Sequence, residues 1–227
     1  MPKRRLSPSR KKLTSIYTPE IKICGITNLD DARAACDAGA DYLGFVLYQK
    51  SPRAITLDAL RRIRNKLDKN TKCIGVFVNK PPLAVAKIAA DCGLDFVQLC
   101  AEEQYESFRL LPLPIWRVIR IQNGLPQPAP AKWPAERYVL DSSQPGFYGG
   151  TGTAMDWSIA AGIAKEHKMM LAGGLTPANI ATAIRIVRPF GVDVSSGIEC
   201  RPGKKDHEKM RLFIEVVKKA CNDLRSQ

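Results

Sequence analysis

The sequence predicts an α/β fold: a single (β/α)8 barrel whose fifth helix is missing or vestigial. Short apolar segments typical of buried strands alternate with helical patterns at intervals of about 25 residues, which indicates repeated βα units. Eight such segments can be counted, and 227 residues suit one barrel of compact size. We expect residues 1–19 to form a flexible basic tail and residues 20–227 to form the barrel domain.

Five strands and four helices are expected in the first half of the barrel. The strand segments cover residues 21–24, 41–47, 72–78, 95–99 and 115–121, and the helical patterns cover residues 26–38, 57–67, 82–92 and 102–110. Four prolines between Gln122 and Glu136 forbid a regular helix after the fifth strand. The fifth helix should therefore be absent or vestigial.

Three further strands and three helices are expected in the second half. The strands cover residues 137–140, 168–172 and 191–195. Asp156 is placed to cap the first helix, while Thr176 and Pro177 suit the start of the second, which should run to about Arg188. The last helix carries an amphipathic stripe that should close the ring against the first strand. The apolar members of this stripe are Met210, Phe213, Val217, Ala220 and Leu224.

The composition and charge favour a globular protein that acts on an anionic small molecule. The chain is 45% hydrophobic and 25% charged, and no run of about 18 apolar residues could span a bilayer. Of the formal charge of +13, six positive charges lie in residues 1–19, which leaves +7 for the barrel. We expect no membrane partner, and no nucleic-acid partner because no basic face interleaved with aromatic residues is visible.

Seven scattered cysteines without a C-x-x-C pair indicate free thiols in a reducing compartment, so we expect a cytoplasmic protein. The basic N-terminal tail leaves organelle targeting as an alternative. His167 and His207 are the two histidines of the chain, which makes a His-based metal site improbable. We expect no metal, and a monomer and a homodimer both remain open.

Chemically capable side chains follow the strands where the βα loops of a barrel gather. Cys24 ends the first strand, Arg53 follows the second, Gln98 lies on the fourth and Asp141 ends the sixth. From the strand pattern alone, Cys24 is better interpreted as a small buried hydrophobic residue. Asp141 alone could be a turn or cap residue, although a carboxylate at the end of an apolar strand is costly unless it is paired or used.

Two glycine-containing loops predict a phosphate site. Backbone N–H groups can converge in such loops, and barrels often bind phosphate after their last two strands. The residues concerned are Gly173 and Gly174 after the seventh strand, and Ser195, Ser196 and Gly197 after the eighth. A third loop, containing Gly149, Gly150, Thr151 and Gly152, lacks the lysine of a Walker A motif and is better interpreted as a loop that closes over a ligand.

In combination and order, eight motifs of this chain resemble those of the phosphoribosylanthranilate isomerase family of tryptophan biosynthesis. They are Lys22–Thr27, Gly44-Phe45 with Ser51–Arg53, Gly75–Asn79, Val97–Leu99, Leu140–Ser142, Gly149–Gly152, Leu171–Leu175 and Val192–Glu199. The resemblance covers residues 21 to about 221. It implies a barrel without a cofactor that converts N-(5-phosphoribosyl)anthranilate into the corresponding 1-deoxyribulose 5-phosphate by an Amadori rearrangement.

The resemblance also implies a role for each residue at a strand end. Cys24 matches the general base, Asp141 the general acid, and Arg53 the residue that contacts the anthranilate carboxylate. The loops after the seventh and eighth strands match the phosphate site, and Gln98 is a further candidate for substrate contact. The chemistry suits these residue types, because ring opening needs a proton donor and a thiolate is a stronger base than a carboxylate.

Two departures affect details of substrate contact. Cys100 and Ala101 stand where the family usually has histidine and glycine, and Thr153 stands where a basic residue is frequent. Other phosphate-binding barrels are competing hypotheses: a pentose-phosphate epimerase would need metal ligands or paired acids, and indole-glycerol-phosphate synthase would need a catalytic lysine. Two non-catalytic hypotheses also compete. The presence of both Cys24 and Asp141 argues against a phosphoribosyl sensor, and a lack of DNA binding at any salt concentration would exclude a basic-tailed nucleic-acid binder.

Overall fold

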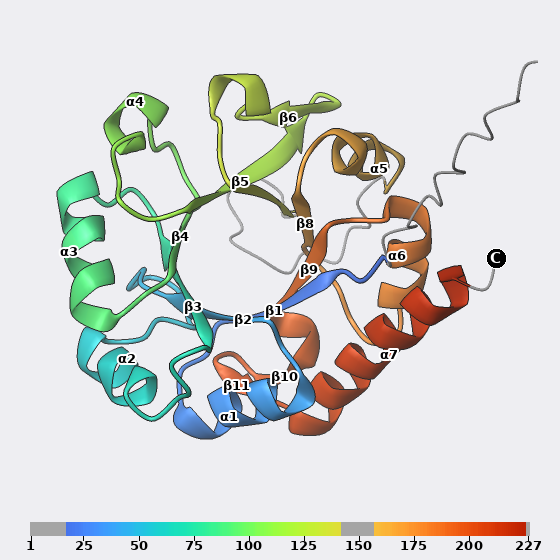
Figure 1. Cartoon of the computed structure of the whole chain (residues 1–227), viewed down its shortest axis with the longest axis horizontal. Coiled ribbons are helices and arrows are strands. Elements are labelled where there is room, and N and C mark those ends of the chain that lie inside the picture. Colours follow the sequence, from blue (N-terminus) through green and yellow to red (C-terminus); the bar gives the residue numbers. More distant parts are fainter. Residues whose placement is uncertain (1–16, 142–156, 226–227) are drawn as a thin grey trace, which may run out of the picture.

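The computed structural model describes residues 17–141 and 157–225. Eight parallel strands form a closed ring, with helices around its outside (Figure 1). These strands are β1 (Glu20–Cys24), β2 (Tyr42–Val46), β3 (Lys72–Phe77), β4 (Phe96–Leu99), β5 (Ile115–Gln122), β7 (Arg137–Asp141), β8 (Met169–Ala172) and β9 (Gly191–Val194). Pairing of β4 with β5 and of β1 with β9 completes the ring, so the predicted (β/α)8 barrel is confirmed.

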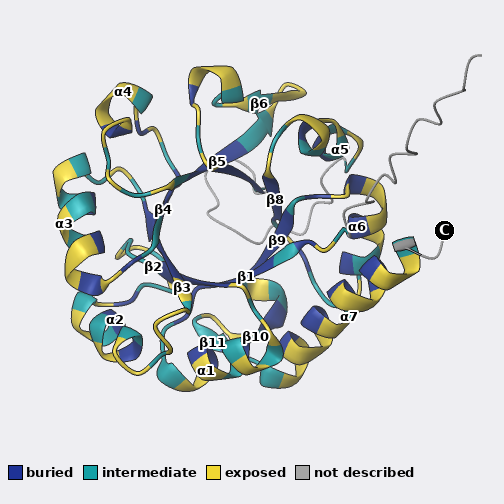
Figure 2. Cartoon of the chain, in the orientation of Figure 1, coloured by how far each residue is buried: buried dark blue, intermediate teal, exposed yellow. Residues whose placement is uncertain are grey.

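The helices cover the outside of the barrel and bury the face that meets the strands (Figure 2). They are α1 (Leu29–Ala38), α2 (Leu57–Arg64), α3 (Pro82–Cys92), α4 (Tyr105–Phe108), α5 (Trp157–Glu166), α6 (Ile180–Val187) and α7 (His207–Arg225). Met210, Phe213, Val217 and Ala220 of α7 are buried, which confirms most of the predicted stripe. Among the described helices, none is long and apolar enough to cross a membrane.

No α-helix lies between β5 and β7, as the prolines predicted. Instead, β6 (Leu125–Gln127) folds back antiparallel to β5, and a short 3₁₀ helix, η1 (Pro130–Lys132), follows it. An edge strand such as β6 tolerates proline, which has no backbone N–H, because an outward-facing position of an edge strand needs no N–H donor. Trp133, which is buried, anchors this connection by donating its indole N–H to the carbonyl of Glu103 at 2.8 Å.

Several predicted helices are shorter than expected, and for two of them the cause is visible in the structure. The pattern over residues 102–110 yields only α4, because the Glu103 carboxylate accepts the backbone N–H groups of Asn79 and Ala101 and holds its segment in a loop. The helix expected from Thr176 begins at Ile180. Here Asn179 accepts the N–H of Thr176 at 2.8 Å, so Thr176 lies in a turn before the helix rather than at its cap.

Two small elements were not predicted. After β9 the chain forms a 3₁₀ turn, η2 (Ser196–Ile198), and then a two-stranded antiparallel hairpin. The hairpin strands are β10 (Glu199–Arg201) and β11 (Lys204–Lys205). They carry no apolar alternation from which they could be recognised.

Alternation along the strands divides the buried side chains into two layers, because successive residues of a strand point to opposite faces. Side chains such as Ile23 and Phe77 point outward and pack beneath the helices. Tyr42, Phe96 and Trp116 point inward and meet edge-on or tilted, with ring centroids 4.9–5.8 Å apart. This aromatic cluster fills the barrel near the N-terminal ends of its strands, so space for a ligand is left at the C-terminal ends.

The barrel domain begins before residue 20. Tyr17 packs against the outer core and donates its hydroxyl to the carbonyl of Pro189 at 2.8 Å. Burial raises the pKa of Tyr17 above its ordinary value. Residues 17–19, which we expected to belong to the basic tail, therefore lie on the barrel, and residues 1–16 fall outside the described part of the chain.

Deleting residues 1–16 should leave the melting temperature unchanged, whereas deleting residues 1–18 should lower it by about 4–8 °C. The second deletion removes the packing and the hydrogen bond of Tyr17, together about 2 kcal/mol, and a domain of this size loses about 2–4 °C per kcal/mol. Thermal unfolding followed by circular dichroism measures both variants. Tyr17→Phe is the control for the hydrogen bond alone, and equal melting of the two deletions would contradict this boundary.

Candidate active site

A cavity of about 180 Å³ lies at the C-terminal end of the barrel. Eight residues predicted from the sequence line it: Cys24, Arg53, Gln98, Asp141, Gly173, Gly174, Ser195 and Ser196. Gly197 does not line it, and Gly149, Gly150, Thr151 and Gly152 lie outside the described residues. Within residues 17–141 and 157–225, no group of three or more His, Cys, Asp or Glu side chains could hold a metal ion.

Strand alternation brings Cys24 and Asp141 into the cavity. Cys24 follows the inward-facing Lys22 by two residues on β1, and Asp141 follows Val139 by two on β7. In the ring, β8 and β9 separate these two strands. A ligand in the cavity would thus meet the thiol and the carboxyl group from different sides.

A buried ammonium group lies beside Cys24. Lys22 is 0% exposed, and its Nζ donates to Oδ2 of Asp193 at 2.6 Å and to Oε1 of Gln98 at 2.9 Å. Burial alone would lower the pKa of Lys22, but Asp193 and the nearby Cys24 outweigh it and the pKa is raised. Lys22 is therefore a permanent cation, and the oxygen of Gln98, which we expected to contact substrate, is bound to it.

The Cys24 thiol is 9% exposed. Burial raises the pKa of this thiol, while the Lys22 and Lys205 ammonium groups act in the opposite direction. Space for both side chains comes from Gly44 on β2, because a Cβ there would lie 2.8 Å from Sγ of Cys24 and 3.0 Å from Cε of Lys22. The glycine of β2 is thus a requirement of the site rather than of a turn.

Arg53 forms a forked ion pair with Glu199. Its Nε donates to the two carboxylate oxygens at 3.0 and 3.1 Å, and its Nη2 donates to Oε2 at 2.7 Å. Burial opposes the charge of Glu199, but Arg53 and Lys205 hold the pKa of its carboxyl below the ordinary value. Within the described chain, Nη1 of Arg53 has no hydrogen-bond partner and remains available to a ligand.

Lys205 joins the two ends of the ring. Its buried Nζ donates to the carbonyl of Cys24 at 2.6 Å, to the carbonyl of Ser195 at 3.2 Å and to Glu199 at 3.0 Å. Burial lowers the pKa of Lys205, and Glu199 partly offsets this effect. The β10–β11 hairpin therefore fixes the backbone at the ends of β1 and β9.

The two glycine loops touch each other. Gly173 and Gly174 adopt positive φ angles of 84° and 65°, a conformation that other residues rarely adopt. Gly197 lies against the same loop, because a Cβ on it would be 1.9 Å from the carbonyl oxygen of Leu175. Gly197 thus supports the predicted phosphate site by allowing this close approach, although its own atoms do not line the cavity.

Sequence reasoning missed five charged residues at this site: Lys22, Arg120, Asp193, Glu199 and Lys205. A signal existed for Lys22 and Asp193, since opposite charges interrupt two apolar strands that the ring places side by side, in register. Arg120 could have been found from its even spacing after Trp116 and Val118. Glu199 stood in the last family motif without a role, and Lys205 gave no signal, because their hairpin was not predicted.

Comparisons with known proteins identify one family. A family model described as N-(5'phosphoribosyl)anthranilate (PRA) isomerase matches residues 21–216. The N-(5'-phosphoribosyl)anthranilate isomerase of Pelobacter propionicus is 44% identical over 204 residues, 90% of this chain and 98% of the relative.

Two solved structures are also similar. Phosphoribosyl anthranilate isomerase from Thermotoga maritima is 36% identical with a TM-score of 0.79, covering 89% of this chain and 100% of that chain. An isomerase in complex with reduced 1-(o-carboxyphenylamino)-1-deoxyribulose 5-phosphate is 34% identical with a TM-score of 0.76, at the same coverage.

Proposed function

The chain belongs to the N-(5'-phosphoribosyl)anthranilate isomerase family, and we propose that it performs the isomerisation with Cys24 as general base and Asp141 as general acid. The reaction is the Amadori rearrangement of N-(5'-phosphoribosyl)anthranilate to 1-(2-carboxyphenylamino)-1-deoxyribulose 5-phosphate, a step of tryptophan biosynthesis. The observation that carries the proposal is the cavity that Cys24 and Asp141 both line from strands that are not neighbours.

The reaction needs two proton transfers. Asp141 donates a proton to the ring oxygen of the furanose, which opens the ring and leaves a Schiff base between C1′ and the anthranilate nitrogen. The Schiff base makes the C2′ hydrogen acidic, and the Cys24 thiolate removes it. The resulting enolamine tautomerises to the ketone. The anthranilate nitrogen is the electron sink, so the proposed mechanism requires no cofactor.

Lys22 is the positioning residue for the base. An ammonium group has three N–H donors, and Gln98 and Asp193 accept two of them. Cys24 lies beside this ammonium group, whose positive charge stabilises a thiolate more than a thiol. Because a buried thiol resists ionisation, the charge of Lys22 increases the fraction of thiolate that is present for catalysis.

The ends of the substrate would be held on either side of the acid and the base. Backbone N–H groups of Gly173, Gly174, Ser195 and Ser196, with Gly197 supporting the loop, are the proposed phosphate ligands. Arg53 is the proposed contact for the anthranilate carboxylate, through its Nη1. Gln98 would contact the substrate through its amide group, and the loop containing Gly149–Gly152 is the proposed closing loop.

The expected partner is this small-molecule substrate, and we place the enzyme in the cytoplasm as a monomer or homodimer. All seven cysteines are unpaired, which fits a reducing compartment. A structure of monomers generated from the dimeric isomerase of Thermotoga maritima is 37% identical to this chain, with a TM-score of 0.75. Mixing the purified protein with phosphoribosylanthranilate and following the loss of anthranilate fluorescence tests the activity directly.

Cys24→Ser and Asp141→Asn should each lower kcat by at least about 10²–10⁴, the usual contribution of a positioned acid or base. An alcohol keeps the shape of the thiol but is a far weaker acid, so almost no alkoxide forms. Neither change removes the phosphate loops or Arg53, so affinity for a product analogue should stay within about tenfold. Steady-state kinetics and calorimetry measure the two effects, and near-wild-type turnover of Cys24→Ser would falsify the base assignment.

The pH dependence of the rate should be bell-shaped, because the base must be ionised while the acid is protonated. The apparent pKa values of its two limbs describe the coupled pair of groups. Burial raises the pKa of the Cys24 thiol above its ordinary value. The alkaline limb of kcat/KM should therefore lie above 9.0, the ordinary thiol value. A limb below this value, or the same limb in Cys24→Ser, would contradict the assignment.

A further inference from the structure

Arg120 lines the cavity at the C-terminal end of the barrel, which we call the mouth, and it lacks a carboxylate partner within the described residues. Arg53, which also lines the mouth, is paired with Glu199, and the nearby Lys22 and Lys205 are paired with Asp193 and Glu199. Within the described residues, Arg120 makes no ion pair. Its printed hydrogen bond runs from Nη1 to the carbonyl of Cys100 at 3.1 Å, which leaves Nε and Nη2 available.

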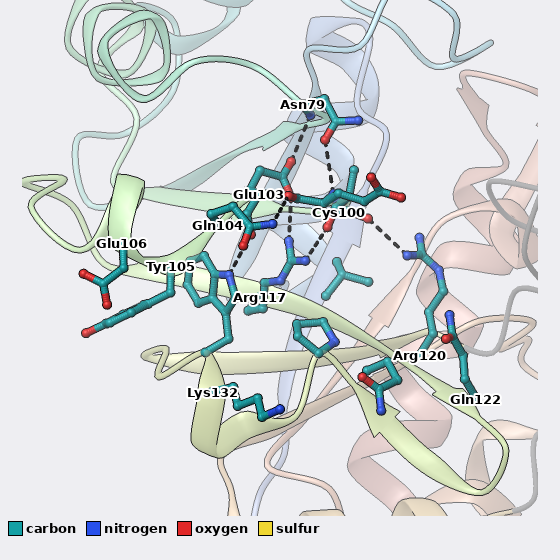
Figure 3. Close-up of a pocket in the computed structure, with 16 residues that line it drawn as sticks. Asn79, Cys100, Glu103, Gln104, Tyr105, Glu106, Arg117, Arg120, Gln122 and Lys132 are labelled. Atoms are coloured by element: carbon teal, nitrogen blue, oxygen red, sulfur yellow. Dashed lines mark hydrogen bonds and ion pairs between the residues drawn. The ribbon is translucent and has the colours of Figure 1, made fainter.

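The position of Arg120 follows from the alternation of β5. Trp116 and Val118 point into the barrel, and Arg120 is the next residue in that series. It lines the mouth cavity and also a side cleft of about 680 Å³ between the segment after β4 and the β5–β6 hairpin. Cys100 and Val118 line both spaces as well, so the cavities meet at Arg120. In Figure 3 the Arg120 guanidinium points toward Cys100, away from Tyr105 and Lys132.

The substrate offers two anionic groups at opposite ends, a phosphate and an aromatic carboxylate. The glycine loops proposed for the phosphate follow β8 and β9, and the strand order places β3 and β4 across the barrel from them. Arg53, after β2, and Arg120, at the end of β5, flank that far side. A carboxylate held there would lie between the two guanidinium groups.

We infer that Arg120 binds the carboxylate of the substrate's aromatic ring and so determines specificity for a carboxylated arylamine. The inference rests on the proposed function and adds a second cation to the Arg53 contact. Arg53 already gives two of its N–H-bearing nitrogens to Glu199, whereas Arg120 can present Nε and Nη2 as a fork to two carboxylate oxygens. The bond from Nη1 to Cys100 holds the guanidinium at the rim of the cavity.

Two stable ligands test this contact: 1-(2-carboxyphenylamino)-1-deoxyribitol 5-phosphate and the same compound without its carboxylate. Calorimetry should show that Arg120→Gln weakens binding of the carboxylated ligand about tenfold or more and changes binding of the other less than twofold. Arg120→Lys keeps the charge but loses the fork, so it should fall between Arg120→Gln and wild type. In turnover, Arg120→Gln should raise KM more than it lowers kcat.

Lys132→Gln is the matched control. It removes the same charge from the side cleft, but Lys132 does not line the mouth, so both affinities should match wild type. If Arg120→Gln weakens the binding of both ligands equally, Arg120 only shapes the mouth through Cys100. If both affinities are unchanged, Arg120 does not contact the substrate. Either result overturns the inference. Failure of the wild-type protein to convert phosphoribosylanthranilate would instead count against the proposed function.

Discussion

The buried ion pair between Lys22 and Asp193 is the interaction on which the site depends. It joins the first and last strands of the ring, β1 and β9, at a distance of 2.6 Å. Burying two charges costs several kcal/mol each, and a well-packed pair of apolar side chains in their place would often give an equally stable or more stable fold. The pair also has a second effect, since the same cation that joins these strands lies beside Cys24 and favours ionisation of its thiol, the proposed general base.

The fold was predictable where local patterns and tertiary packing agree. Alternation placed Cys24 and Asp141 at inward strand ends, and four prolines removed the fifth helix, because these signals act within a few residues. Prediction failed where a side chain captures backbone groups: Glu103 holds the N–H groups of Asn79 and Ala101, and Asn179 holds that of Thr176. Such competition depends on neighbours in space, which helical periodicity does not record.

The candidate site was predictable for the residues that line the cavity and less so for those that support them. Lys22 and Asp193 stood in the sequence as charges within apolar strands, but their partnership follows only from strand order. Glu199 and Lys205 come from a hairpin without a periodic signal, yet they fix Arg53 and the end of β1. With these charges paired, Arg120 remains the unpaired cation of the described mouth, and the electrostatics of the cavity suit an anionic ligand.

The most direct test of this account is the pKa of Cys24, read from the pH dependence of its alkylation with peptide mass spectrometry. Wild type is compared with Lys22→Met/Asp193→Asn, which leaves no unpaired buried charge at the pair. Lys22 favours the thiolate more than Asp193 opposes it, so the double variant should alkylate at higher pH. Cys100, whose pKa burial raises to about 12, is a comparison within the same cavity and should move less. An unchanged or lower pKa of Cys24 in the double variant would contradict the role of the ion pair.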